Sequence, residues 1–145
     1  MKHLISVLTL VILASCNMKN TQESEKIKQN PNDILAIKTM LNNQQECWNN
    51  GDIDGFMQGY WNSEGLIFTS LRHKPAYGWK NTLERYRNSY PNKESMGEFK
   101  FEILDLKLTS SSTSTVKGKW ELIREKDNPN GIFWLDIDKF DKDWL

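Results

Sequence analysis

Residues 48–57 read Trp-Asn-Asn-Gly-Asp-Ile-Asp-Gly-Phe-Met, and this stretch predicts the junction between two helices. Gly51 can take the left-handed backbone that ends a helix, and Asp52 can cap the next one. Before the junction, after Pro31, apolar residues recur at helical spacing. After it, a shorter apolar stripe follows the same period. The residues of the two stripes are Ile34, Ile37, Leu41 and Trp48, and then Ile53, Phe56, Met57 and Tyr60.

The chain that follows predicts one strand, one more helix and a run of antiparallel strands. Residues 65–70 form a short apolar run between turn residues, which is typical of a strand. From Trp79 to Tyr90 the large residues are spaced by four, three and four, and Pro91 ends this third helix.

The last third of the chain alternates apolar and polar residues as strands do. Alternation from Phe99 changes phase between Ile103 and Leu104, which predicts a bulge. Two further strands, over residues 116–122 and 132–138, flank a strong turn signal, and another begins at Trp144. The order of helices and antiparallel strands predicts an α+β fold in which a curled sheet cups the helices.

Length and composition limit the classes of function. The 145 residues fit one domain, and 38% apolar with 26% charged residues is ordinary for a globular protein. Lys and Arg total 19, as do Asp and Glu, so no net positive charge attracts a phosphate backbone. We therefore expect no nucleic-acid partner.

The N-terminus indicates export. Ten largely apolar residues, Leu4 to Leu13, are too few to span a bilayer but suit a secretory signal. Residues 13–16, Leu-Ala-Ser-Cys, resemble the lipobox of bacterial lipoproteins, which implies cleavage before Cys16 and its lipidation. An ordinary signal peptide cut near Ala14 or Ser15, with Cys16 unmodified, is the alternative. Asn17 after the cysteine implies sorting to the outer membrane.

We accordingly expect a signal peptide over residues 1–15, a lipidated Cys16 with a flexible tether over 16–31, and a folded domain over 32–145. The tether is rich in Asn, Lys, Gln, Glu and Ser. Once Cys16 carries lipid, only Cys47 remains, so no internal disulfide can form, and Cys47 is expected to be a small buried apolar residue.

Several aromatic and glycine clusters together resemble one family. Besides residues 48–57, they are Tyr60-Trp61, Tyr77-Gly78-Trp79, Arg85-Tyr86, Tyr90-Pro91, Gly97 and Gly118-Lys119-Trp120. From about Ile34 to Trp144 the chain is similar to exported bacterial SnoaL-like proteins of the nuclear transport factor 2-like superfamily, which share the cystatin-like fold.

The resemblance implies a cone-shaped roll, in which a strongly curved antiparallel sheet wraps around the N-terminal helices and leaves a pocket at one end. It also implies dimers through the outer sheet face, where Ile132 and Trp134 are expected. Relatives continue past the position of Trp144 and end near an Asp-His-Thr or Asp-His-Ser triplet. Because this chain stops at Leu145, we expect either that it is a fragment or that the last strand is truncated and leaves backbone unpaired.

The inventory of catalytic residues is small. His73 is the one imidazole after the signal and lies in a polar stretch expected to be a surface loop, and with so few His and Cys we expect neither a metal site nor a cofactor. A carboxylate desolvated in the cone could move a proton. The candidates, each more easily explained by a surface or capping role, are Asp54, Glu84, Glu102, Glu121 and Asp136.

Aromatic residues offer the stronger candidate site. Rings with polar tips suit a pocket that holds a flat or apolar molecule, and Arg85 adds a handle for an anion, although core packing explains most of these rings as well. The candidate binding residues are Tyr60, Trp61, Tyr77, Trp79, Arg85, Tyr86 and Trp120, with Tyr90 beside them. A membrane-tethered domain that binds a small apolar molecule is the favoured interpretation. The alternatives are an isomerase, dehydratase or cyclase using a carboxylate, and an envelope interaction or dimerisation module.

Overall fold

The computed structural model describes residues 27–70 and 73–145. The predicted signal peptide, Cys16 and most of the predicted tether lie outside this range. In chain order the elements are α1 (Pro31–Asn49), α2 (Ile53–Met57), β1 (Ile67–Ser70), β2 (His73–Tyr77), α3 (Trp79–Ser89), α4 (Lys93–Met96), β3 (Glu98–Leu108), β4 (Thr113–Ile123), β5 (Asn130–Phe140) and β6 (Asp143–Trp144). None of the helices in these two ranges is long and apolar enough to cross a membrane.

The helix junction at Gly51 is as predicted. Gly51 has a φ of 79°, in the left-handed region that ends α1, and the Asp52 carboxylate accepts a hydrogen bond of 2.8 Å from the backbone N–H of Gly55. At the other end of α1, the Asn30 side chain accepts from the N–H of Asn32 over 3.0 Å. The second helix is shorter than its apolar stripe suggests, because α2 already ends at Met57.

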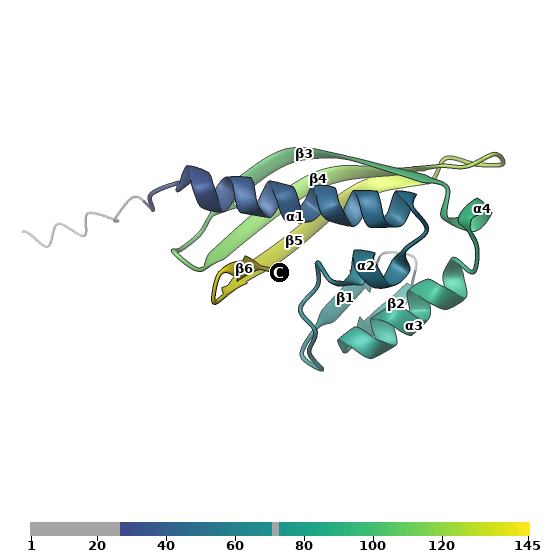
Figure 1. Ribbon diagram of the computed structural model, residues 1–145, viewed down its shortest axis with the longest axis horizontal. Helices are drawn as coiled ribbons and strands as arrows, with labels where there is room; N and C mark the ends of the chain where they lie inside the picture. Colours follow the sequence, from purple (N-terminus) through teal and green to yellow (C-terminus); the bar gives the residue numbers. More distant parts are fainter. Residues whose placement is uncertain (1–26, 71–72) are drawn as a thin grey trace, which may run out of the picture.

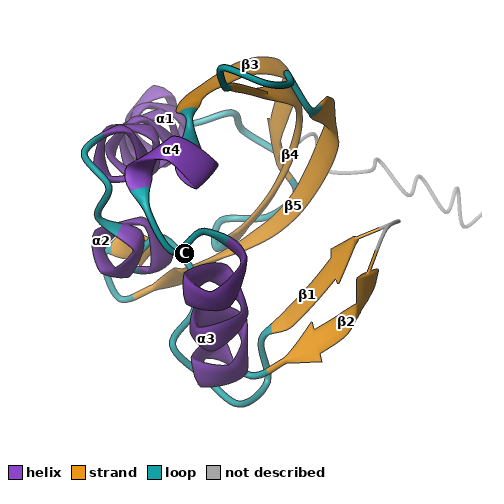
Figure 2. Ribbon diagram, turned by 90° about the vertical axis from the view of Figure 1, so that its right-hand side faces the viewer, coloured by secondary structure: helices purple, strands orange, loops and turns teal. Residues whose placement is uncertain are grey.

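Four strands form the main sheet in the order β3-β4-β5-β6, and each pair is antiparallel. The register shifts between Ile103 and Asp105, which confirms the bulge. The sheet curls around α1, which lies along its concave side, while α2, α3 and the hairpin of β1 and β2 lie below the C-terminal half of α1 in Figure 1 (Figures 1 and 2). The predicted α+β roll with a curved antiparallel sheet is confirmed.

Two elements differ from the prediction. Residues 73–77 form β2, which pairs with β1 in a separate two-stranded sheet, so His73 begins a strand and does not lie in a loop. The sequence of β2 hides this strand, because Pro75 and the polar residues around it suit only a sheet edge. The short helix α4 is also absent from the prediction. It is fixed by a capping box between Asn92 and Ser95.

The core has two parts, one at each end of α1. The first lies between the start of α1 and the end of the sheet that carries β6, and the second joins the end of α1 to α2, α3 and α4. The buried residues of the first are Ile37, Leu41, Leu108, Val116, Ile137 and Trp144. Those of the second are Trp48, Phe56, Met57, Leu83, Met96 and Leu122.

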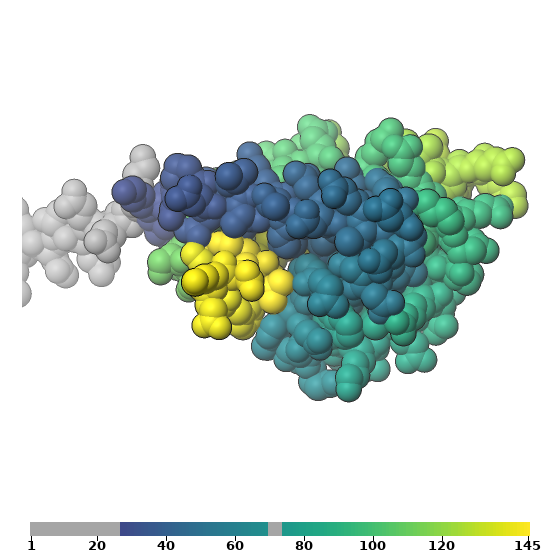
Figure 3. Space-filling view, in the orientation of Figure 1, coloured from purple at the N-terminus to yellow at the C-terminus, as the bar shows by residue number. Residues whose placement is uncertain are grey.

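Asp33 joins the first turn of α1 to the last two strands. Its carboxylate accepts hydrogen bonds from Nζ of Lys139 over 2.6 Å and from Nε1 of Trp144 over 3.1 Å. Only 13% of the Asp33 side chain is exposed, and Figure 3 shows the C-terminal residues lying against α1. The bond from Lys139 is the main cause that lowers the pKa of Asp33, and it outweighs the opposing effect of burial.

We expect Asp33→Asn to lower the midpoint of urea unfolding at pH 7. Because the folded-state pKa of Asp33 is lowered, its contribution to stability is present above the unfolded pKa of about 4 and is lost as pH falls through the folded value. The difference between the variant and the original chain should therefore shrink below pH 4. Asp136→Asn, at an exposed position, is the control, and equal pH profiles for the two variants would contradict this role of Asp33.

Candidate functional site

Seven rings gather between the helices and the end of the sheet opposite β6. They come from α1, α2, β1, α3 and β3 and from the chain just after α2 and just after α3, and most neighbouring pairs meet edge to face with ring centroids 4.8 to 6.4 Å apart. We call this set the aromatic cluster: Trp48, Phe56, Tyr60, Phe68, Tyr86, Tyr90 and Phe99.

The phenol groups of the aromatic cluster are held in their neutral form. Burial raises the pKa of Tyr60 to about 12, and a side-chain hydrogen bond with Tyr86 opposes part of that rise. Burial also raises the pKa of Tyr86 well above its usual value, and that of Tyr90 to a smaller degree. These hydroxyls are therefore protonated at neutral pH and can donate hydrogen bonds within apolar surroundings.

Five of the seven predicted binding residues lie in or beside the aromatic cluster. Tyr60 and Tyr86 belong to it, and Trp79 and Trp120 pack against the same part of the core. Nε1 of Trp79 donates to the carbonyl oxygen of Met57 over 2.9 Å, which fixes that ring. The guanidinium of Arg85 lies 6.0 Å from the centre of the Phe68 ring.

The other two predicted residues lie away from the aromatic cluster. Trp61 is 41% exposed and stacks on Phe140, with ring centroids 5.6 Å apart. Tyr77, at the end of β2, is 60% exposed. Sequence reasoning placed them in the site because Trp and Tyr carry polar tips, whereas the fold turns both side chains outward. The same criterion missed Phe56, Phe68 and Phe99, whose only sequence signal is their position on the inward face of an element.

The rings pack against one another where the sequence suggested a hollow. Two cavities lie nearby, and neither is lined by any of the seven predicted residues. One, of about 330 Å³, lies between α2 and α4 and reaches the aromatic cluster at Tyr90. Its apolar side is formed by Ile53, Pro91 and Met96.

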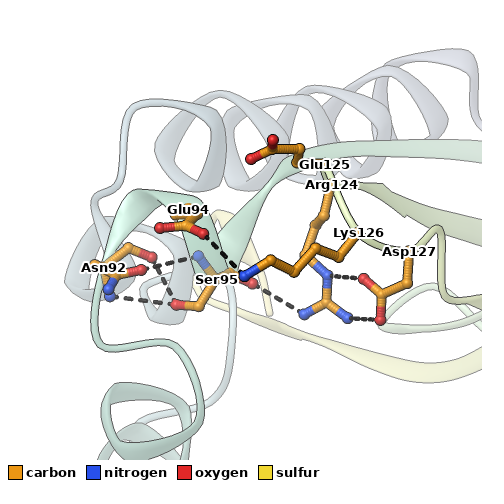
Figure 4. A pocket seen from close by; sticks show the side chains of 7 residues that line it. All are labelled: Asn92, Glu94, Ser95, Arg124, Glu125, Lys126 and Asp127. Atoms are coloured by element: carbon orange, nitrogen blue, oxygen red, sulfur yellow. Dashed lines mark hydrogen bonds and ion pairs between the residues drawn. The ribbon is translucent and has the colours of Figure 1, made fainter.

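The other cavity, of about 350 Å³, lies beside α4 and is lined by charged side chains that pair with each other (Figure 4). Arg124 donates to both carboxylate oxygens of Asp127, over 2.6 and 2.8 Å, and to the carbonyl oxygen of Ser95. Lys126 pairs with Glu94 at 3.8 Å. These contacts attach the turn between β4 and β5 to α4, which is a structural role.

None of the five candidate carboxylates lies among the rings. Asp54, Glu84, Glu102 and Asp136 are exposed, and Glu121 is half-buried beside Lys119 on the outer face of β4. Asp54 pairs with Arg87 at 2.6 Å and Glu102 with Lys119 at 3.4 Å. An acid that transfers a proton in this type of site needs apolar surroundings, and these positions do not provide them.

Cys47 is half-buried, and burial is the largest cause that raises its thiol pKa, followed by the charges of Asp52 and Glu46. A raised pKa keeps the thiol protonated and weakly nucleophilic. Within residues 27–70 and 73–145, no three His, Cys, Asp or Glu side chains are grouped to hold a metal ion.

Comparison with solved structures identifies the family. The chain is 43% identical to an NTF-2-like protein of unknown function from Shewanella oneidensis MR-1, with a TM-score of 0.75 over 78% of this chain and 93% of that one. The chain belongs to the NTF-2-like proteins. Neither a protein-family model nor a curated protein matches its sequence.

Solved structures with lower sequence identity show only that this chain shares their fold. A domain of unknown function with a cystatin-like fold from Nostoc punctiforme is 16% identical, with a TM-score of 0.66 over 79% of this chain and 73% of that one. A ketosteroid isomerase-like protein from Erwinia carotovora atroseptica is 13% identical, with a TM-score of 0.61 over 79% and 91%. Such a fold hosts many activities, so the fold alone does not select one for this chain.

Proposed function

We propose that this NTF-2-like protein is a membrane-tethered domain that binds a small apolar or aromatic molecule at the aromatic cluster. The observation that carries the proposal is the set of neutral phenol groups among stacked and edge-to-face rings. Such surroundings bind a flat apolar body, and the hydroxyls of Tyr60 and Tyr86 supply directional hydrogen bonds to a polar group on it.

Access to the aromatic cluster supports binding there. Tyr60, Phe68, Arg85 and Tyr86 are half-buried, so the cluster reaches the surface beside α3. The cavity of about 330 Å³ meets it at Tyr90. A ligand that enters from this cavity has to displace or slide between rings, which makes the site adaptable in shape.

The exposed positions of the candidate acids favour binding over catalysis. An isomerase or dehydratase mechanism requires a carboxylate beside the bound molecule, with a pKa near the working pH. Among the described residues, Asp33 has a side chain that is only 13% exposed, but its pKa is lowered and its Oδ1 accepts hydrogen bonds from both Lys139 and Trp144. It also lies at the opposite end of α1 from the aromatic cluster.

The ligand proposal predicts binding of 1-naphthol, a flat aromatic molecule with one hydroxyl. We expect it to raise the melting temperature of the full chain and to change the fluorescence of the tryptophans. Tyr86→Phe keeps the ring and removes one hydrogen bond of about 1 kcal/mol, so the dissociation constant should rise about fivefold. The measurement is a fluorescence titration of both proteins.

Tyr77→Phe is the matched control, because it removes the same hydroxyl from an exposed ring outside the aromatic cluster. Its affinity should equal that of the original chain. If 1-naphthol, estradiol and palmitate all leave the melting temperature of the folded chain unchanged, binding at the aromatic cluster is wrong. Equal losses in both Tyr variants would place the ligand elsewhere.

The tether is the second part of the proposal and rests on the lipobox-like residues 13–16. The chain enters α1 at the end far from α2 and α3, and Gln29 is held there by two hydrogen bonds with the backbone of Leu108 (Figure 1). Since α1 has 19 residues and is therefore about 28 Å long, a lipid at Cys16 would be attached at the end of the domain that lies farther from the aromatic cluster.

Labelling of cells with a palmitate analogue tests this tether. We expect the full chain to be labelled and Cys16→Ala to lose the label, while Cys47→Ala, which keeps the predicted lipidation site, retains it. Labelled Cys16→Ala protein would contradict lipid attachment at this residue without bearing on the ligand site.

A further inference from the structure

Arg85 is a half-buried cation beside the aromatic cluster. It lies on α3, and its guanidinium is 6.0 Å from the centre of the Phe68 ring. The same ring meets that of Tyr60 at 6.3 Å and that of Tyr86 at 5.6 Å between centroids. Phe68 is therefore the shared neighbour of two phenol rings and one positive charge.

Arg85 has no counter-ion among residues 27–70 and 73–145. Arg87, two residues further along α3, pairs with Asp54 at 2.6 Å, whereas no described carboxylate pairs with Arg85. A partner on the same helix would stand three or four residues away, and those positions carry no acid. They are Asn81, Thr82, Asn88 and Ser89. The Arg85 guanidinium therefore loses part of its hydration without gaining an ion pair in return.

The part of the chain around Arg85 is positively charged. Residues 67–89, from the start of β1 to the end of α3, contain five Lys and Arg and one acidic residue, Glu84, although the whole chain has no net charge. Since α3 packs beside the hairpin of β1 and β2, the described charges of this set lie on neighbouring elements (Figure 2). Such an excess of positive charge attracts an anion to the surface where Arg85 lies.

We propose that the molecule bound at the aromatic cluster is an ionised carboxylic acid, with its flat apolar body among the rings and its carboxylate paired with Arg85. This inference rests on the proposed binding function and names the class of its ligand. A carboxylate matches the planar fork of a guanidinium, which can donate two parallel hydrogen bonds to it. The pair would also give Arg85 the counter-ion that the described residues do not supply.

Arg85 and Tyr86 are able to act on one ligand group. Burial raises the pKa of Tyr86 well above its usual value, and the positive charge of Arg85 opposes part of that rise, so the guanidinium acts electrostatically on the Tyr86 hydroxyl. A carboxylate bound here would pair with Arg85 and accept a hydrogen bond from the protonated hydroxyl of Tyr86. A neutral polar group would keep the bond to Tyr86 and lose the ion pair, and an amine would be repelled by Arg85.

The test compares 1-naphthoate, ionised at pH 7, with 1-naphthamide, which has nearly the same shape and no charge. By isothermal titration calorimetry we expect the full chain to bind 1-naphthoate about tenfold more tightly, the gain typical of a charge-assisted hydrogen bond. Arg85→Gln should abolish this preference. It should leave the affinity for 1-naphthol unchanged, because 1-naphthol carries no charge at pH 7 and the rings keep their places.

Lys80→Gln is the matched control, because it removes one positive charge from an exposed position of the same helix. It should retain the preference for 1-naphthoate over 1-naphthamide. An equal loss of the preference in Lys80→Gln and Arg85→Gln would show that the carboxylate responds to the overall charge of α3, and it would overturn pairing with Arg85.

The three ligands separate the failure of this inference from the failure of the proposed function. If 1-naphthol binds but 1-naphthoate binds no more tightly than 1-naphthamide, the carboxylate is wrong and binding at the aromatic cluster stands. If none of the three binds to the folded chain, both the class of ligand and the binding site are wrong.

Discussion

Replacing Trp48 with alanine is expected to lower the free energy of unfolding by about 3 to 5 kcal/mol, the range for removing a large buried aromatic side chain. Trp48 is 3% exposed and lies at the centre of the aromatic cluster. Its ring meets those of Phe56 at 5.1 Å and Tyr90 at 4.8 Å, and its Nε1 donates to the carbonyl oxygen of Met96 over 3.2 Å. The loss would be measured by urea unfolding followed by circular dichroism.

Two variants separate the causes of this loss. Trp48→Phe keeps much of the ring contact and removes the hydrogen bond to Met96, so we expect a smaller loss, of about 1 to 3 kcal/mol. Trp134→Ala removes the same side chain from the exposed face of β5 and should change stability by about 0.5 kcal/mol or less. If Trp48→Ala were no more harmful than Trp134→Ala, the aromatic cluster would not be part of the folding core.

Trp48 belongs both to the proposed ligand site and to the core, and three tyrosines lie beside it. A domain that used all of its rings for packing would gain nothing from keeping three phenol hydroxyls inside, since phenylalanine fills almost the same space without a polar group to satisfy. Burial raises the pKa values of Tyr60, Tyr86 and Tyr90 because it disfavours their ionised forms, so the three hydroxyls stay neutral. Hydrogen bonding to a ligand would be a use of these hydroxyls that phenylalanine could not serve.

The spacing of apolar residues in the sequence predicted those helices and strands that have a continuous apolar face. The bulge after Ile103 followed from one change of phase, and the helix stop from Gly51 and Asp52, because each depends on residues adjacent in the sequence. β2 was missed because a two-stranded hairpin with Pro75 needs neither alternation nor apolar residues on both sides.

The sequence predicted only part of the candidate site, because residue type does not reveal which side chains the fold exposes. Residue type selected Tyr60, Tyr86, Trp79 and Trp120, which the fold brings into the same part of the core. It could not distinguish them from Trp61 and Tyr77, since exposure depends on how the hairpin and the end of β5 are placed in three dimensions. The contacts of the amide side chains on α1 could not be predicted either, because helical periodicity identifies Asn and Gln only as polar residues.

Asn49→Ala is expected to lower the free energy of unfolding by about 2 to 4 kcal/mol, although asparagine near a helix end usually contributes little. Its amide accepts from the N–H of Phe99 over 2.7 Å and donates to the carbonyl oxygen of Phe99 over 3.0 Å. Alanine would leave both groups of this half-buried strand residue without partners. Chemical unfolding gives the loss, and hydrogen exchange of the Phe99 amide should accelerate at the same time.

Asn43→Ala is the matched control, because Asn43 is an exposed residue of the same helix and alanine there costs nothing in helix propensity. Asn49→Asp retains the acceptor for the Phe99 N–H and loses the donor, so its stability should lie between those of the original chain and Asn49→Ala. Equal stability of the two alanine variants would show that water replaces the amide without cost. In that case α1 would hold the sheet by its apolar face alone.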